Sequence, residues 1–277
     1  MTTATTTPQN TSGDGGSLRW ALADSWVLTG RSLAHWARNP APVIIGLLFP
    51  IMMVLMFGYL FGGAMDVPGG GNYREFLVPG MFAMTMVFGI EVTMLAVITD
   101  TARGVTDRFR AMPTSSAAVV TGRSIADMLN SVVGLSVMIL CGLAVGWRAH
   151  EGFSRALAAV GLLLLLRFAL LWVGIYLGLV FTDTAAVTAV QTLVWPLGFL
   201  SNAFVSPDTM PGWLAAIADW NPLSATGTAT RELFGNPGWQ GSSWAAEHAI
   251  LLGVLWPAVI CAIFFPLAVR RYQSLGR

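Results

Sequence analysis

Four arginines and three aspartates are concentrated between Asp100 and Asp127, in a chain in which only 10% of the residues are charged. Alternating charges, a turn-forming glycine, apolar side chains and a terminating proline predict a short helix that offers charge and an apolar contact to a partner protein. A signal for membrane topology alone would also explain the four arginines, but not the alternation of charges or the apolar side chains among them. The residues assigned to the contact are Arg103, Gly104, Asp107, Arg108, Phe109, Arg110 and Pro113.

Two ionisable residues, Glu91 and Arg167, lie inside long apolar segments. A lipid-facing arginine costs at least about 2.5 kcal/mol on insertion scales, so both side chains are expected to face protein or water. Each is a candidate pathway residue, and a polar contact between helices or a snorkelling arginine is the structural alternative. Glu91 lies about 10 Å from the cytoplasmic end of its segment and Arg167 lies near the middle of its own, so the two are not expected to pair.

The sequence carries no constellation that is typical of an enzyme. His35, His150 and His248 are isolated, and neither a glycine-rich phosphate loop nor a serine elbow is present. All fifteen basic residues are arginines, so the chain lacks the lysine of a phosphate-binding P-loop. Cys141 and Cys261 lie far apart in apolar segments, which disfavours a disulfide or a metal site. We expect no catalytic, cofactor or metal site here, and any nucleotide hydrolysis belongs to another polypeptide.

Apolar helices must position these residues. The chain is 55% hydrophobic, whereas soluble domains carry far more charge than this one. Lipid cannot satisfy exposed backbone groups, so segments of about 20 apolar residues predict an all-α membrane protein, in which Pro50, Pro79 and Pro196 are tolerated within helices. Six transmembrane helices are predicted, at residues 42–61, 76–98, 125–146, 156–181, 185–204 and 250–269.

The distribution of arginines predicts the orientation of the six spans. With both termini on the inner side, ten arginines lie inside and four lie outside. Inner loops of membrane proteins are enriched in arginine, so both termini are predicted to be cytoplasmic. The four outer arginines are Arg74, Arg148, Arg155 and Arg231.

Three further segments have distinct compositions. Residues 1–17 are rich in Thr, Ser and Gly and predict a disordered cytoplasmic tail. Residues 18–39 separate a charged face from an apolar face at helical spacing, which predicts an amphipathic helix in the inner headgroup layer or, alternatively, a helix packed on a soluble domain. Residues 205–249 combine prolines, tryptophans and short apolar pieces, which predicts short re-entrant helices or a structural cap before the last span. The six-span domain covers residues 40–277.

The patterns DTARGVTDRFRAMP and GRSIAD, followed by PLGFLSNAFVSPDTMPGWL and WNP, resemble the ABC-2 family of ABC-transporter permeases, and within it the daunorubicin-resistance type of drug exporter subunit. The likeness covers nearly the whole chain. Family members usually carry a Gly-Thr pair in the inner loop, whereas Val105 follows Gly104 here, and Asp100 and Arg103 occupy the preceding polar positions.

The resemblance implies one half of a membrane pore in the bacterial plasma membrane. A second permease copy or a related subunit would complete the pore, and two ATP-binding subunits, which carry ATP and Mg, would drive it. The charged inner loop would then contact the ATPase, with the 18–39 helix beside it. The implied function is outward movement of hydrophobic or amphipathic small molecules, such as drugs or antibiotics, with no nucleic acid involved. Export of a cell-envelope lipid or lipid-linked glycan and a non-transporting membrane scaffold are the alternatives.

Overall fold

The computed structural model describes residues 41–60, 62, 71–102, 116–205, 207–238 and 243–274. All regular secondary structure within these ranges is helical, in agreement with the predicted all-α class. The predicted tail at residues 1–17 and the predicted amphipathic helix at residues 18–39 lie outside the described residues.

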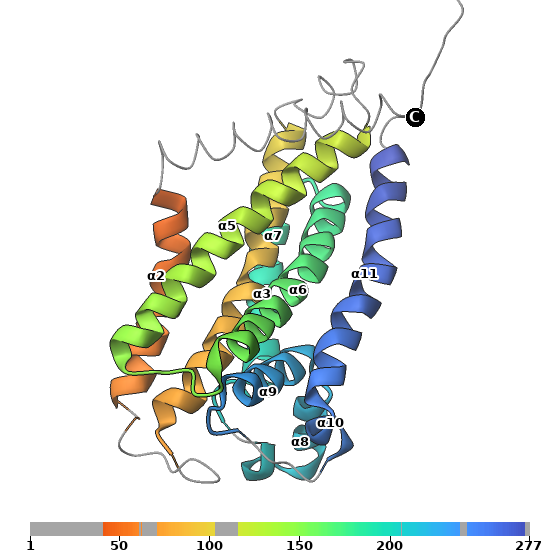
Figure 1. Ribbon diagram of the computed structural model, residues 1–277. Coiled ribbons are helices and arrows are strands. Elements are labelled where there is room, and N and C mark those ends of the chain that lie inside the picture. Colours follow the sequence, from red (N-terminus) through yellow and green to blue (C-terminus); the bar gives the residue numbers. More distant parts are fainter. Residues whose placement is uncertain are drawn as a thin grey trace, which may run out of the picture.

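Four helices are long and apolar enough to cross a membrane: α3 (Tyr73–Ala102), α5 (Ser116–Val145), α6 (Gly152–Val180) and α11 (Ala249–Ser274). They run along the length of the molecule (Figure 1). Their most apolar windows have mean hydropathies between 2.0 and 2.5. Two shorter apolar stretches, within α2 (Ala41–Leu60) and α7 (Ala185–Phe199), pack beside α3. The described part of the chain is therefore a bundle of apolar helices, typical of a multi-pass membrane protein.

Prolines do not interrupt these helices. Pro50 lies within α2, Pro79 within α3 and Pro196 within α7, so the prediction that these three residues are compatible with helix is confirmed. Pro257 and Pro266 lie within α11 in the same way. Neighbouring helices and local adjustments compensate for the missing backbone donor in membrane helices.

Two glycines of α6 allow a close approach between α6 and α3. Gly174 and Gly178 are four residues apart, so they lie on one face of the helix. A Cβ atom on Gly174 would lie 2.9 Å from the Ile90 carbonyl oxygen, and one on Gly178 would lie 2.7 Å from the Cβ of Val97. Small residues at this spacing are typical of closely packed membrane helices.

The chain forms four short helices between α7 and α11 in the sequence, and they lie together at one end of the molecule (Figure 1). They are η1 (Pro207–Thr209), α8 (Gly212–Asp219), α9 (Pro222–Phe234) and α10 (Trp244–Glu247). The side chain of Asn221 caps α9 by accepting a hydrogen bond from the Leu223 backbone N–H, and Gly235 ends the helix at a φ of 68°. Helix α9 is almost completely buried and packs against α3, α6 and α11.

Arg231 of α9 is fully buried, although the sequence analysis counted it among the charges of an outer loop. Its Nε donates to the Phe76 carbonyl oxygen at 2.8 Å, and Nη2 donates to the Asn202 carbonyl oxygen at 2.9 Å. Nη1 lies 3.2 Å from Asn202 Oδ1, and the guanidinium stacks 4.0 Å from the centre of the Phe76 ring. Burial lowers the pKa of Arg231 to about 9, while Tyr73 has the opposite effect, so the side chain remains a charged donor at neutral pH. This arginine holds α9 against α3 and the 201–204 turn.

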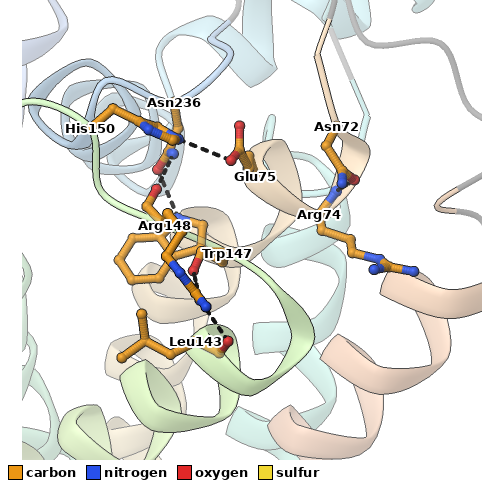
Figure 2. A network of polar contacts seen from close by, with 8 residues as sticks. All are labelled: Asn72, Arg74, Glu75, Leu143, Trp147, Arg148, His150 and Asn236. Carbon is orange, nitrogen blue, oxygen red and sulfur yellow. Dashed lines mark hydrogen bonds and ion pairs between the residues drawn. The ribbon is translucent and has the colours of Figure 1, made fainter.

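At the same end, a network of polar contacts links the connection between α5 and α6 to the start of α3 and to the residues after α9 (Figure 2). Trp147 donates from Nε1 to Asn236 Oδ1 at 2.8 Å, and Asn236 Nδ2 donates to the Arg148 carbonyl oxygen at 2.7 Å. His150 Nε2 lies 3.0 Å from Glu75 Oε1 at the start of α3. These contacts join α3, the α5–α6 connection and the residues after α9.

Candidate functional site: a buried arginine network and an apolar groove

The predicted partner-docking residues, Arg103, Gly104, Asp107, Arg108, Phe109, Arg110 and Pro113, lie outside the described residues. The helices on either side of them are described. Helix α3 ends at Ala102 and α5 begins at Ser116. Both positions lie at the end of the molecule opposite the short helices (Figure 1). Any force applied to the connecting segment therefore acts directly on α3 and α5.

Arg167 lies near the middle of α6 and is buried, with 2% of its surface exposed. Its Nε donates to Ser131 Oγ of α5 at 2.8 Å, and its Nη2 donates to Thr93 Oγ1 of α3 at 2.7 Å. Thr93 in turn donates to Asp127 Oδ2 of α5 at 3.0 Å. We call these four residues the Arg167 network. The network connects three helices through one cation and one carboxylate, with the threonine hydroxyl between them.

The packing around Arg167 leaves one of its nitrogens without a partner. Within the described residues, Nη1 is buried and forms no hydrogen bond. A Cβ atom on Gly89 of α3 would lie 2.5 Å from Arg167 Nε, so the absence of a side chain at Gly89 makes room for the guanidinium. An arginine with an unused donor beside a carboxylate has the means to change partners when the helices move.

The structure separates the two residues that the sequence analysis singled out within spans. Arg167 contacts the side chains of Thr93 and Ser131. Glu91 lies on α3, is partly exposed, and makes no hydrogen bond or ion pair within the described part of the chain. The expectation that Glu91 and Arg167 do not pair agrees with these contacts.

Asp127, the acidic member of this network, was not predicted from the sequence. Asp127 lies inside the predicted span 125–146, yet it was grouped with the charged loop that precedes that span. The available signal is periodicity: Asp127 and Ser131 are four residues apart on α5, as Gly89 and Thr93 are on α3. Polar or small residues at this spacing on two apolar helices indicate that these faces of the helices lie opposite each other around a buried polar group.

An apolar groove follows α2. It has a volume of about 350 Å³, and its walls are formed by Leu48, Phe49, Met52, Met53 and Met56. All five residues belong to α2, so the groove is an open apolar surface along one helix and not an enclosed cavity. The side chains that form these walls include no charged group, so the groove suits an apolar molecule or the apolar part of an amphipathic one.

Three aromatic rings from three helices meet at the edge of this groove. Phe49 of α2 lies 4.6 Å from Trp195 of α7 and 6.1 Å from Phe88 of α3, measured between ring centres. Phe88 and Trp195 lie 5.1 Å apart. We call these residues the aromatic cluster. Phe49 belongs both to the cluster and to the groove.

Residues 24–234 match the family model of the ABC-2 type transporter. The chain belongs to the ABC-2 type transporter family. The match includes the predicted docking segment, the Arg167 network, the groove and α9. This ABC-2 chain is therefore a multi-pass membrane subunit of the permease type.

Named relatives resemble this ABC-2 permease over nearly its full length. A daunorubicin resistance ABC transporter permease of Streptomyces coeruleorubidus is 34% identical over 99% of both chains. A Mycobacterium tuberculosis protein named as a probable doxorubicin resistance ABC transporter permease is 23% identical over 96% of this chain and 95% of its own. Both relatives are named as drug-resistance permeases, and both cover nearly the whole of this chain.

Proposed function

We propose that this chain is the transmembrane permease subunit of an ATP-driven exporter that moves hydrophobic or amphipathic small molecules, including drugs, out of the cell. The full-length similarity to a daunorubicin resistance permease is the observation that carries this proposal. The apolar groove on α2 supports it, because a cargo that partitions into membranes needs an apolar surface to bind.

The proposed topology has six spans with both termini in the bacterial cytoplasm. Four described helices have spanning length, and in this proposal the apolar helices α2 and α7, whose apolar stretches are shorter, would be the remaining two spans. The end with the short helices then faces outward, and the segment at residues 103–115 faces the cytoplasm. The excess of arginines on the proposed inner side supports this orientation.

The proposed energy source is a separate pair of ATP-binding subunits, which hold ATP and Mg. The absence of lysine supports this division, since a P-loop nucleotide site requires that residue. The docking residues between Arg103 and Pro113 would contact the ATP-binding subunits, with the 18–39 helix beside them. A second permease copy or a related subunit would complete the pore.

The Arg167 network gives this proposal a route from the docking segment to the spans. Asp127 lies eleven residues after the start of α5, and Thr93 lies nine residues before the end of α3. Both positions are about 15 Å along their helices from the docking segment. Movement of that segment would shift the α5 side of the network relative to the α3–α6 pair, where Gly174 and Gly178 keep the backbones in contact.

Export of a cell-envelope lipid is the second candidate, because an acyl chain would fit the same apolar groove. A lipid-linked glycan is less compatible, since its sugars require polar partners and the groove walls provide only apolar side chains. A non-transporting scaffold would need no groove.

Transport into inverted membrane vesicles tests the proposed function. Vesicles that contain the chain and its ATP-binding partner are expected to accumulate a fluorescent hydrophobic drug when ATP is added, and to lose this accumulation with a non-hydrolysable analogue. A fluorescent phospholipid and a lipid-linked sugar serve as competing cargoes. ATP-independent distribution of all three compounds would contradict export and favour the scaffold.

A further inference from the structure

Helix α8 turns its large apolar side chains away from the rest of the described molecule. Trp213, Ile217 and Trp220 are spaced four and three residues apart, so they lie on one face of the helix. All three are exposed, and Trp213 is the most open of them at 69%. Ala218, on the opposite side, is fully buried. The helix therefore packs through a small residue and presents its apolar face outward, whereas a helix in water does the reverse.

A stack of exposed rings adjoins the end of α8. The rings of Trp220 and Trp244 are stacked with centres 6.1 Å apart, and the Trp244 ring stacks on His248 at 4.5 Å. The two tryptophans are 54% and 51% exposed. Trp244 begins α10 and His248 directly precedes α11, so the stack links α8, α10 and the start of α11. We call Trp213, Ile217, Trp220 and Trp244 the tryptophan surface.

The ring stack continues into an exposed apolar stripe on α11. His248, Leu251 and Leu255 are spaced three and four residues apart, so they follow one another along one face. Leu251 and Leu255 are exposed, as is Val259 one turn further on. Helix α11 is long and apolar enough to span a membrane, and an exposed apolar stripe on such a helix faces lipid. The ring stack therefore lies where this span begins, which is the level of the membrane boundary.

Polar groups beside the tryptophans match a membrane boundary better than the hydrocarbon core. Asp219 directly precedes Trp220, and Glu247 lies three residues after Trp244. Carboxylates require water, while the indole rings next to them favour an apolar environment. The indole N–H groups of Trp213, Trp220 and Trp244 form no hydrogen bond within the part of the chain that the structure describes. All these requirements are met in the headgroup layer, where tryptophan is enriched.

We propose that the tryptophan surface lies in the headgroup layer of the membrane, with phospholipid as its partner. The indole rings and Ile217 pack against the upper acyl chains, the indole N–H groups donate to headgroup oxygens, and Asp219 and Glu247 remain in water. The end of the molecule with the short helices then lies within the membrane boundary and does not project beyond it. This contact depends on neither ATP nor cargo, so it goes beyond the proposed function.

A single residue connects the tryptophan surface to the buried helix α9. Asn221 follows Trp220, and its Oδ1 accepts from the Leu223 N–H at the start of α9. Its Nδ2 donates to the carbonyl oxygens of Leu197 and Leu200 at the end of α7. A lipid contact at Trp220 therefore fixes the depth of α9 and of the end of α7 in the membrane.

Spin labels on α8 test the lipid contact in the full chain, reconstituted with its ATP-binding partner in phospholipid nanodiscs. Cys141 and Cys261 are first replaced by alanine, and one cysteine is then introduced as Ala216→Cys or Ile217→Cys, both at exposed positions of α8. Collision rates are measured with oxygen, which partitions into lipid, and with a water-soluble nickel chelate. The oxygen-to-nickel ratio is expected to be at least about threefold higher at both sites than at Glu232→Cys, an exposed acidic position of α9.

A label at Leu255→Cys gives the lipid reference and is expected to show a still higher ratio, because it lies deeper along α11. A ratio on α8 equal to that at Glu232→Cys would overturn the proposal, since this face would then lie in water. Low collision rates with both reagents would overturn it as well, because another protein surface would then cover α8. Two label sites on α8 are used so that poor folding of one variant leaves the other to decide.

Removal of the rings tests whether they hold α8 in lipid. Trp213→Ser with Trp220→Ser is expected to lower the oxygen-to-nickel ratio at Ala216→Cys about twofold or more. An unchanged ratio would show that the tryptophans do not make the lipid contact.

The lipid contact and the proposed export function fail separately. A label in water, in a protein that still accumulates drug in vesicles when ATP is added, overturns the lipid contact and leaves export supported. A label in lipid, in a protein that accumulates no compound, supports the lipid contact and contradicts export.

Discussion

At the scale of single residues, two buried arginines differ in how completely their donors are used. Arg231 places each of its three guanidinium nitrogens against an oxygen of Phe76, Asn202 or Ala203. Arg167 uses Nε and Nη2 and leaves Nη1 buried without a partner within the described residues. A guanidinium with every nitrogen hydrogen-bonded suits a fixed structural contact, whereas a nitrogen without a partner near Asp127 suits a contact that changes during a cycle.

A double-mutant cycle tests the connection between Arg167 and Asp127. Arg167→Gln and Asp127→Asn are each expected to lower the free energy of unfolding by about 1–3 kcal/mol, since the first removes the donor to Thr93 and Ser131 and the second removes the negative charge near Arg167. The double variant is expected to lose less than the sum, with a coupling of about 1 kcal/mol. Thermal unfolding in detergent, followed by tryptophan fluorescence, measures these values.

The matched cycle pairs Arg167→Gln with Glu91→Gln. These residues share no contact in the described structure, so their effects are expected to add within about 0.5 kcal/mol. Strong coupling between Arg167 and Glu91, or additive effects of Arg167 and Asp127, would show that Asp127 is not the acidic partner of Arg167.

The contact of Arg231 with backbone carbonyls predicts a structural phenotype. Arg231→Gln is expected to lower the free energy of unfolding by about 3 kcal/mol, because several buried acceptors lose their donor. Arg155→Gln is the control: Arg155 forms an exposed pair with Glu151 at 2.7 Å, and such pairs contribute little. Unfolding midpoints of the two purified variants check the difference, and similar midpoints would contradict the role assigned to Arg231.

At the scale of helices, α3 and α6 are closely packed, and α5 is attached to them by polar contacts near Arg167 and by apolar packing around Gly142. Gly174 and Gly178 bring α6 against the α3 backbone, and the Arg167 network then links α5 to both helices. The polar contacts of α5 involve Asp127 and Ser131, nearer the start of the helix than its apolar contacts at residues 135–145, so we expect the bundle to deform at the polar part. Close apolar packing resists movement, while hydrogen bonds among side chains exchange partners at small cost when replacements are near.

Leucine substitutions test the close packing of α3 and α6. Gly178→Leu is expected to lower the free energy of unfolding by about 3 kcal/mol or more, because even a Cβ atom there would meet Val97. Gly161→Leu on the same helix is the control, since no atom lies within 4 Å of its added Cβ. The yield and unfolding temperature of the purified proteins report the effect, and equal tolerance at both positions would refute close contact at Gly178.

At the scale of the whole molecule, hydropathy and proline tolerance were predictable from sequence because they are properties of contiguous residues. Arg231 shows the limit of this reasoning: its partner at Phe76 is 155 positions away, so nothing nearby distinguishes it from a loop charge. The role of Asp127 could have been predicted from its spacing to Ser131, but only if Asp127 was assigned to the helix that contains Ser131 and not to the preceding loop. The aromatic cluster needs three helices in contact, and no local pattern predicts which rings of α2, α3 and α7 meet.

The central claim is that an ATP-binding partner drives this ABC-2 permease through the segment at residues 103–115. Affinity purification in mild detergent, after expression with the neighbouring genes, tests it most directly. The account predicts that an ATP-binding subunit is recovered in equal proportion and is lost in the double variant Arg108→Glu with Arg110→Glu. Arg270→Glu with Arg277→Glu makes the same change of charge elsewhere on the proposed cytoplasmic side and should retain the partner. Recovery of the chain alone, or intact association of the Arg108 and Arg110 variant, would contradict the account.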